Sequence, residues 1–141
     1  MKTIILFLLS LSPCYALTFE DVIEAIAIVE SSGKADAFNR KENAIGLLQI
    51  RPIMVKDYNR IYKTDFDHAT AWDAEASKMI AMGIFKHYTK NIDRVTAKHL
   101  AFIWNGGGSA WVRVDAPKDD HKQRQLEIYW GKVEKVLTTK Q

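Results

Sequence analysis

Residues 19–33 read FEDVIEAIAIVESSG. Apolar side chains fall on nearly every side of a helix drawn through this stretch, a pattern typical of a helix buried in the middle of a domain. Thr18 is the expected N-cap, with Asp21 in the reciprocal position, and Ser32-Gly33 is expected to end the helix. We therefore predict a core helix that carries Glu30 to the edge of the protein interior.

Glu30 is an unusual residue for this end of a helix. A helix C-terminus carries partial negative charge, so an acid there is disfavoured by about 0.3–1 kcal/mol. From residue type alone, an exposed surface glutamate is the simpler interpretation. At the edge of an apolar pocket, however, burial raises the pKa of a carboxyl group, which can then donate a proton to a leaving oxygen near neutral pH. Cleavage of a glycosidic bond needs such an acid.

Residues 1–16, MKTIILFLLSLSPCYA, have the pattern of a secretory signal. A positively charged start precedes an apolar run over residues 4–11, and Ala16 is the expected cleavage point. The segment is too short to span a bilayer. A buried N-terminal helix and a lipid anchor on Cys14 are the alternatives. We predict an exported protein of the periplasm or the extracellular space.

The composition is that of one globular domain. The chain has 141 residues, of which 48% are hydrophobic and 26% are charged, which fits a single core over residues 17–141. Its only cysteine, Cys14, lies in the signal segment, so the exported chain is expected to fold without disulfides. The net charge of +3 favours association with an anionic polymer. No basic run is present, so nucleic acid is not an expected partner.

Further helices are expected after the first one. They start at Pro52 and after Asp73, and cover Thr96–Trp104 and Lys122–Leu137. The polar segments 34–45, 63–70 and 113–122 are expected to be loops. The predicted fold class is a mostly α, single compact domain with little or no sheet.

Neither a metal nor a cofactor is expected. The four histidines are scattered, with no paired spacing that would suit a metal, and such histidines are usually solvated. They are His68, His87, His99 and His121. The glycines at 106–108 are not followed by the Lys-Ser/Thr pair of a phosphate-binding loop.

Several short motifs occur in a characteristic order. They are Glu30-Ser31 after an apolar helix, Gly46-Leu47-Leu48-Gln49-Ile50, Ile103-Trp104-Asn105-Gly106-Gly107 and Tyr129-Trp130-Gly131-Lys132-Val133. Together they resemble the soluble lytic transglycosylase family, relatives of goose-type lysozyme, over roughly residues 20–137. The resemblance implies a lysozyme-like helical fold. Leu48 stands where the family often has methionine, and Trp104 where it often has tyrosine.

The resemblance also implies a role for each motif residue. Glu30 would be the single catalytic acid and base, and Ser31 would help to orient it. Gly46, Leu47, Leu48 and Gln49 would line the sugar cleft. Asn105 would bind substrate, Gly106 would permit close approach, and Tyr129 would place its hydroxyl near Glu30. The alternatives are that Gln49 caps the helix starting at Pro52, that Asn105 only ends a helix, and that Tyr129 is a core residue.

The substrate that the resemblance implies is the glycan strand of peptidoglycan, cut by a monomer between N-acetylmuramic acid and N-acetylglucosamine. The muramic acid C6 hydroxyl would attack the anomeric carbon and give a 1,6-anhydro product. A lysozyme-type hydrolase is one alternative, and its second carboxylate would lie about 5–9.5 Å away. The candidates are Asp36, Glu42, Asp57 and Asp73. A non-catalytic wall-binding module is the other alternative.

Overall fold

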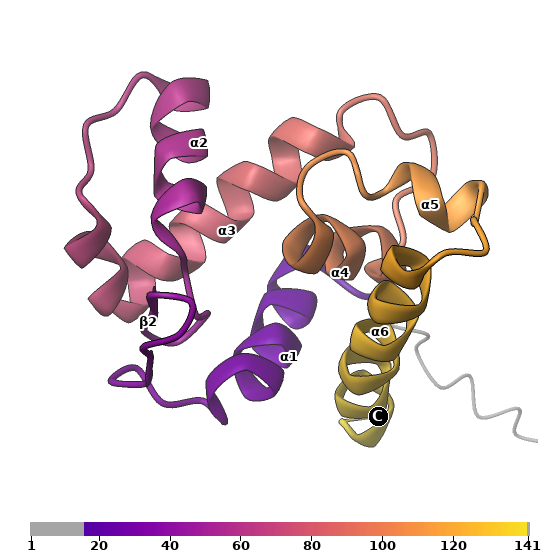
Figure 1. Cartoon of the computed structure of the whole chain (residues 1–141), viewed down its shortest axis with the longest axis horizontal. Coiled ribbons are helices and arrows are strands. Elements are labelled where there is room, and N and C mark those ends of the chain that lie inside the picture. The colour runs from indigo at the N-terminus through magenta and orange to yellow at the C-terminus, as the bar shows by residue number, and fades with distance from the viewer. Residues whose placement is uncertain (1–15, 141) are drawn as a thin grey trace, which may run out of the picture.

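The computed structural model of the chain describes residues 16–140. It contains six α-helices, one short 3-10 helix and a two-stranded antiparallel sheet, which confirms the mostly α fold class (Figure 1). Except for Ala16, the expected signal segment lies outside the described residues. No helix within residues 16–140 is long and apolar enough to cross a membrane.

The two strands fall between the first and the second α-helix of the chain. The helices are α1 (Phe19–Ser31), α2 (Pro52–Tyr62), the 3-10 helix η1 (His68–Trp72), α3 (Ala74–Thr89), α4 (Ala97–Gly106), α5 (Val112–Asp115) and α6 (His121–Thr139). The strands are β1 (Phe38–Asn39) and β2 (Ala44–Ile45), and they form a hairpin in which Phe38 pairs with Ile45.

Short-range capping interactions set several helix ends. Thr18 and Asp21 form a capping box at the start of α1, and the Asp73 side chain accepts a backbone hydrogen bond in the first turn of α3. Ser32 and Gly33 take left-handed conformations, with φ of 55° and 76°, and end α1. The predicted bounds of α1 and the start of α3 are therefore confirmed.

Helix α1 lies in the core of the molecule and packs against α3, α4 and α6. Its side chains at Val22, Ala25 and Ile26 are at most 1% exposed, so the expected core helix is confirmed. In Figure 1, α2, the hairpin and η1 lie to one side of α1, and α4, α5 and α6 lie to the other. Glu30 is the residue before the last of α1.

Three segments expected to be loops contain short elements instead. Residues 34–45 include the hairpin, and η1 starts at His68 within 63–70. Helix α5 overlaps the start of 113–122, and the first two residues of α6 lie at its end. Helix α5 is a single turn without buried residues, so its sequence has no apolar periodicity that would reveal it. Such short elements depend on their neighbours rather than on their own helix or strand propensity.

Candidate active site

Glu30 and Tyr129 meet where α1 packs against α6. The Tyr129 hydroxyl donates a 2.7 Å hydrogen bond to Oε1 of Glu30, across 99 positions of sequence. Glu30 is half-buried and Tyr129 is 8% exposed. Tyr129 therefore packs in the core through its ring and contacts the acid through its hydroxyl, so the two roles considered for it are compatible.

The surroundings of Glu30 favour its protonated form. Burial raises the pKa of Glu30 above its ordinary value, and the nearby Glu42 adds to this rise. The hydrogen bond from Tyr129 and the charges of Arg51 and Lys132 act in the opposite direction. The pKa of Tyr129 is raised well above its ordinary value, first by burial and then by Glu30, so its hydroxyl keeps the proton that it donates.

A cavity of about 220 Å³ opens beside Glu30. Its walls come from the end of α1, the turn of the hairpin, the start of α2 and the end of α4. The lining residues are Glu30, Glu42, Gln49, Arg51, Met54, Trp104 and Asn105. The structure thus brings together the predicted residues Glu30, Gln49 and Asn105, which come from three separate motifs.

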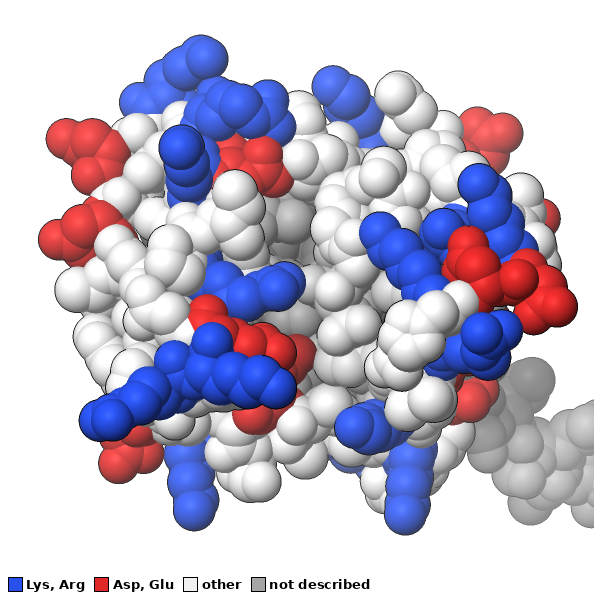
Figure 2. All heavy atoms as spheres, viewed as in Figure 1, with Lys and Arg blue, Asp and Glu red and all other residues white. Residues whose placement is uncertain are grey.

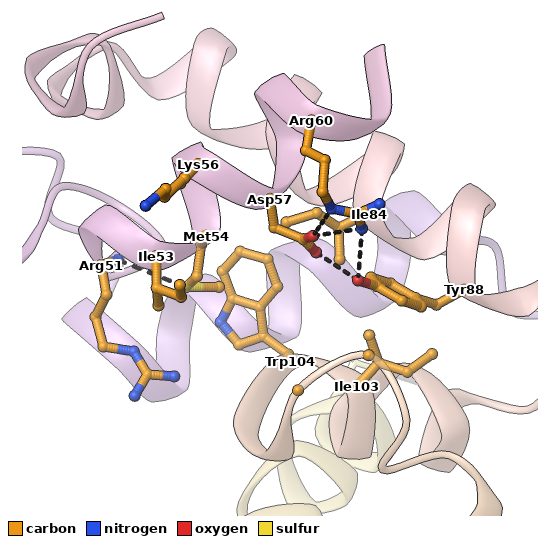
Figure 3. Close-up of a pocket in the computed structure, with 12 residues that line it drawn as sticks. Arg51, Ile53, Met54, Lys56, Asp57, Arg60, Ile84, Tyr88, Ile103 and Trp104 are labelled. Carbon is orange, nitrogen blue, oxygen red and sulfur yellow. Dashed lines mark hydrogen bonds and ion pairs between the residues drawn. The ribbon is translucent and has the colours of Figure 1, made fainter. Parts of the chain in front are cut away.

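A larger cavity of about 530 Å³ adjoins the first one. Arg51, Met54 and Trp104 line both cavities, so the two form one cleft between α2 on one side and α4 on the other. Figure 2 shows this face of the molecule hollowed between its two halves. Figure 3 shows the larger cavity, with the Trp104 ring between residues of α2 and Tyr88 of α3. An extended ligand could therefore reach Glu30 along the cleft.

The candidate second carboxylates differ in their positions. Asp57 lines the larger cavity, where it is bonded to Arg60 at 2.7 Å and to the Tyr88 hydroxyl at 2.6 Å. Asp73 caps α3, and Asp36 is exposed and is not among the residues that line the cleft. Of these candidates, Glu42 shares the cavity with Glu30.

Gln49 braces the hairpin from the wall of the smaller cavity. Its backbone has a φ of 49°, and its Nε2 lies 3.1 Å from the carbonyl oxygens of Ala37 and Gly46. The N-cap residue of α2 is Arg51. The interpretation of Gln49 as a helix cap is therefore wrong.

Two of the histidines, His68 and His99, form hydrogen bonds within the fold. His99 is 3% exposed, so the expectation that the histidines are solvated is wrong for this residue. Its Nδ1 accepts from the Thr96 amide at 3.1 Å. Nε2 of His68 lies 2.7 Å from the Ile50 carbonyl oxygen. No group of three or more His, Cys, Asp or Glu side chains suited to a metal ion occurs within residues 16–140.

The model of the Transglycosylase SLT domain family matches residues 18–126 of the chain. The chain belongs to this lytic transglycosylase family. The family acts on peptidoglycan, which is thus the substrate class. No curated protein and no solved structure matches the chain.

The family match covers every residue that lines the smaller cavity, including Glu30, Gln49 and Asn105. Tyr129 lies beyond the matched range. Arg51 and Met54 also line the cavity, although the sequence does not single them out as site residues, and Glu42 lines it as one of the candidate second carboxylates. Arg51 follows the motif Gly46–Ile50 directly, which is the signal that would have pointed to it.

Other motif residues support the cavity from behind. The Ser31 hydroxyl is buried, lies 2.7 Å from the Leu47 carbonyl oxygen, and so ties the end of α1 to the Gly46–Ile50 segment. Leu47 and Leu48 are 9% and 0% exposed and pack in the core.

Two glycines in these motifs allow close packing. Gly46 has a φ of 76°, and a Cβ there would meet the carbonyl oxygen of Ala71. A Cβ at Gly106 would come within 2.7 Å of Leu126 on α6. Gly106 therefore permits a close approach between α4 and α6.

Proposed function

We propose that the protein is a peptidoglycan lytic transglycosylase in which Glu30 is the single catalytic acid and base. The bond cut is the one between N-acetylmuramic acid and N-acetylglucosamine, and the product carries 1,6-anhydro-N-acetylmuramic acid. The observation that carries the proposal is the half-buried Glu30 carboxyl, held by Tyr129 and facing a cavity of the cleft. Family membership supplies the substrate class.

In the first step the protonated Glu30 donates its proton to the glycosidic oxygen. The bond from that oxygen to the anomeric carbon breaks, the N-acetylglucosamine side leaves as an alcohol, and positive charge develops at the anomeric carbon. The raised pKa of Glu30 supports this step, because it keeps the carboxyl protonated to higher pH than a solvated glutamate.

In the second step the Glu30 carboxylate accepts the proton of the muramic acid C6 hydroxyl. The C6 oxygen then bonds to the anomeric carbon, which closes the anhydro ring without water and returns Glu30 to its protonated form. The Tyr129 hydroxyl donates to Oε1, so it stabilises the carboxylate between the two steps and leaves Oε2 for the substrate.

Gln49 and Asn105 line the same cavity as Glu30, and we propose that they contact the sugars. The other motif residues would not contact the sugars with their side chains but would position the backbone that faces the substrate. They are Ser31, Gly46, Leu47, Leu48 and Gly106. A buried hydroxyl and buried leucines are better suited to support than to direct contact with sugars.

A lysozyme-type hydrolase is the second candidate function. It is favoured by Glu42, which lines the cavity of Glu30 and would activate a water molecule. The two functions differ in their products, because hydrolysis leaves a reducing end whereas transglycosylation leaves an anhydro sugar.

The experiment is digestion of purified peptidoglycan by the protein, followed by mass spectrometry of the soluble muropeptides. Anhydro products that disappear with Glu30→Gln are the expected result. Reducing-end products that require Glu42 would instead establish the hydrolase. Wall binding without any product would leave a non-catalytic binding module.

We further propose that residues 1–16 direct export and that residues 17–141 form the catalytic domain, which acts as a monomer in the periplasm or the extracellular space. N-terminal sequencing of the protein recovered outside the cytoplasm is expected to start at Leu17. Light scattering of the purified protein is expected to give the mass of one chain. Recovery only in the cytoplasm would refute the export proposal.

A further inference from the structure

The larger cavity of the cleft carries two cations that form no ion pair within the described residues. Arg51, Lys56 and Arg60 line it, together with the single acid Asp57. Arg60 pairs with Asp57 at 2.7 Å. Neither Arg51 nor Lys56 takes part in an ion pair within residues 16–140. This part of the cleft therefore has two cations available to a ligand.

Both cations belong to the N-terminal half of α2, because Arg51 is its N-cap residue and Lys56 lies five positions further along the helix. Figure 3 shows Arg51 and Lys56 on one side of the Trp104 ring, and the group of Asp57, Arg60 and Tyr88 on the other. Lys56 is exposed and Arg51 is half-buried. Because Arg51 also lines the cavity of Glu30, the cationic side begins next to the acid and extends away from it along α2.

The remaining wall of this cavity is largely apolar. It is formed by Met54, Ile84, Ile103 and Trp104. An apolar wall with a cationic rim suits a ligand that has an uncharged body and anionic groups at its side. A small inorganic anion would leave the apolar wall without a partner.

We propose that Arg51 and Lys56 bind carboxylates of the peptide stems of peptidoglycan, so that the enzyme favours glycan whose stems carry free acids. This inference rests on the proposed function. N-acetylated sugars whose lactyl groups are joined to peptides are uncharged, and the anionic groups of such a strand are the free carboxylates of its stems. A guanidinium matches a carboxylate through two parallel hydrogen bonds, whereas an ammonium acts as a point charge.

The first test measures binding and does not depend on cleavage. The probe is a purified disaccharide–tetrapeptide with free carboxylates, compared by calorimetry with the same molecule after conversion of its carboxylates to amides. The two sugars of this probe are joined through the anomeric carbon of N-acetylglucosamine. The probe therefore lacks the linkage from the anomeric carbon of N-acetylmuramic acid that the enzyme would cut. We expect the free acid to bind about two- to fivefold more tightly, the range typical of exposed charge pairs, and the difference to shrink at high salt.

Charge-neutralising variants assign the preference to particular side chains. Lys56→Gln and Arg51→Gln are each expected to reduce the ratio of the two affinities toward one. Lys122→Gln is the matched control, because Lys122 is exposed in the first turn of α6 and is not among the residues that line the cleft. Equal affinities in the unmodified protein, or an unchanged ratio in both cleft variants, would overturn the proposal.

The second test compares cleavage of native peptidoglycan with cleavage of the same material after amidation. Lys56→Gln is used here, because Arg51 also influences the pKa of Glu30. We expect the variant to lower the ratio of the rate on native material to the rate on amidated material toward one. A drop in rate on both substrates alike would contradict the assigned role. Failure of the unmodified protein to release product from either substrate would refute the proposed function. The binding test would then still decide whether Arg51 and Lys56 recognise stem carboxylates.

A third test uses glycan from which an amidase has removed the peptide stems. This glycan carries free lactyl carboxylates on its sugars and no stem carboxylates, so it distinguishes the two kinds of carboxylate. If Lys56→Gln weakens binding of this glycan alone, the cations recognise the sugar rather than the peptide, and the proposal is wrong.

Discussion

Replacing Tyr129 by phenylalanine removes one hydroxyl next to Glu30 and keeps the aromatic ring in the core. The hydroxyl is the donor of the 2.7 Å hydrogen bond to Oε1 of Glu30, and this bond lowers the pKa of Glu30 against the effect of burial. Removal of this hydrogen bond destabilises the charged carboxylate of Glu30 more than it destabilises the neutral carboxyl form. The Tyr129→Phe variant is therefore expected to hold its Glu30 proton to higher pH than the unmodified protein.

The size of the effect follows from the strength of the bond. A hydrogen bond to a charged group contributes about 1.5–3 kcal/mol, and about 1.4 kcal/mol corresponds to a tenfold change in a protonation equilibrium. Because Glu30 is only half-buried, we take the lower end, about tenfold. The alkaline limb of the pH–activity profile should then move upward by about one pH unit.

The assay is the initial rate of muropeptide release from peptidoglycan between about pH 4 and 9, at fixed ionic strength, under conditions that report kcat/KM. Tyr62→Phe is the matched control, because the Tyr62 hydroxyl donates a hydrogen bond of the same length, 2.7 Å, to the Gly83 carbonyl oxygen away from the cleft. Both variants should lose some thermal stability. Only Tyr129→Phe should move the profile.

An unchanged profile in Tyr129→Phe would show that the hydroxyl does not tune the acid. A profile that moves to lower pH would contradict the direction worked out from the contact. An equal shift in Tyr62→Phe would mean that the change reflects a general loosening of the fold rather than the loss of one donor.

Three further variants test other parts of the site. Because the folded chain binds the Glu30 proton more tightly than the unfolded chain does, its stability falls as pH rises from the ordinary pKa of Glu30 through its raised pKa. Glu30→Gln, which cannot ionise, should thus melt at a higher temperature than the unmodified protein at pH 7 and at the same temperature below about pH 4. Glu42→Gln should move the alkaline limb of the pH–activity profile to lower pH, because it removes a like charge that raises the pKa of Glu30; no movement would exclude an electrostatic role for Glu42. Ser31→Ala should lower the free energy of unfolding in urea by about 1–3 kcal/mol, because the carbonyl of Leu47 loses a buried donor, and a negligible change would show that this tie is not needed.

The helices that could be predicted from the sequence are those with local signals. The capping box of Thr18 and Asp21 and the cap at Asp73 act over three positions, so the sequence alone reveals them. The hairpin has strands of two residues each, and α5 is a single turn. Their formation depends on packing between distant segments, which periodicity does not report.

In the candidate site too, local features could be predicted from the sequence and long-range contacts could not. The unusual acid at the end of an apolar helix is a local feature, and the family motifs pointed to its neighbours Gln49 and Asn105. The tie between Ser31 and Leu47 and the placement of Glu42 and Arg51 in the cavity result from how the hairpin folds against α1 and α2. These long-range placements could not be read from motif spacing.

The hydrogen bond between Glu30 and Tyr129 joins two helices that are separated by most of the chain. A chain that has not yet docked α6 onto α1 has the acid without its donor and without the buried environment that raises its pKa. Assembly of the proposed catalytic centre therefore requires α6 to dock onto α1. A chain kept unfolded, as during the proposed export, would lack this centre and would acquire it only in the compartment where it completes its fold.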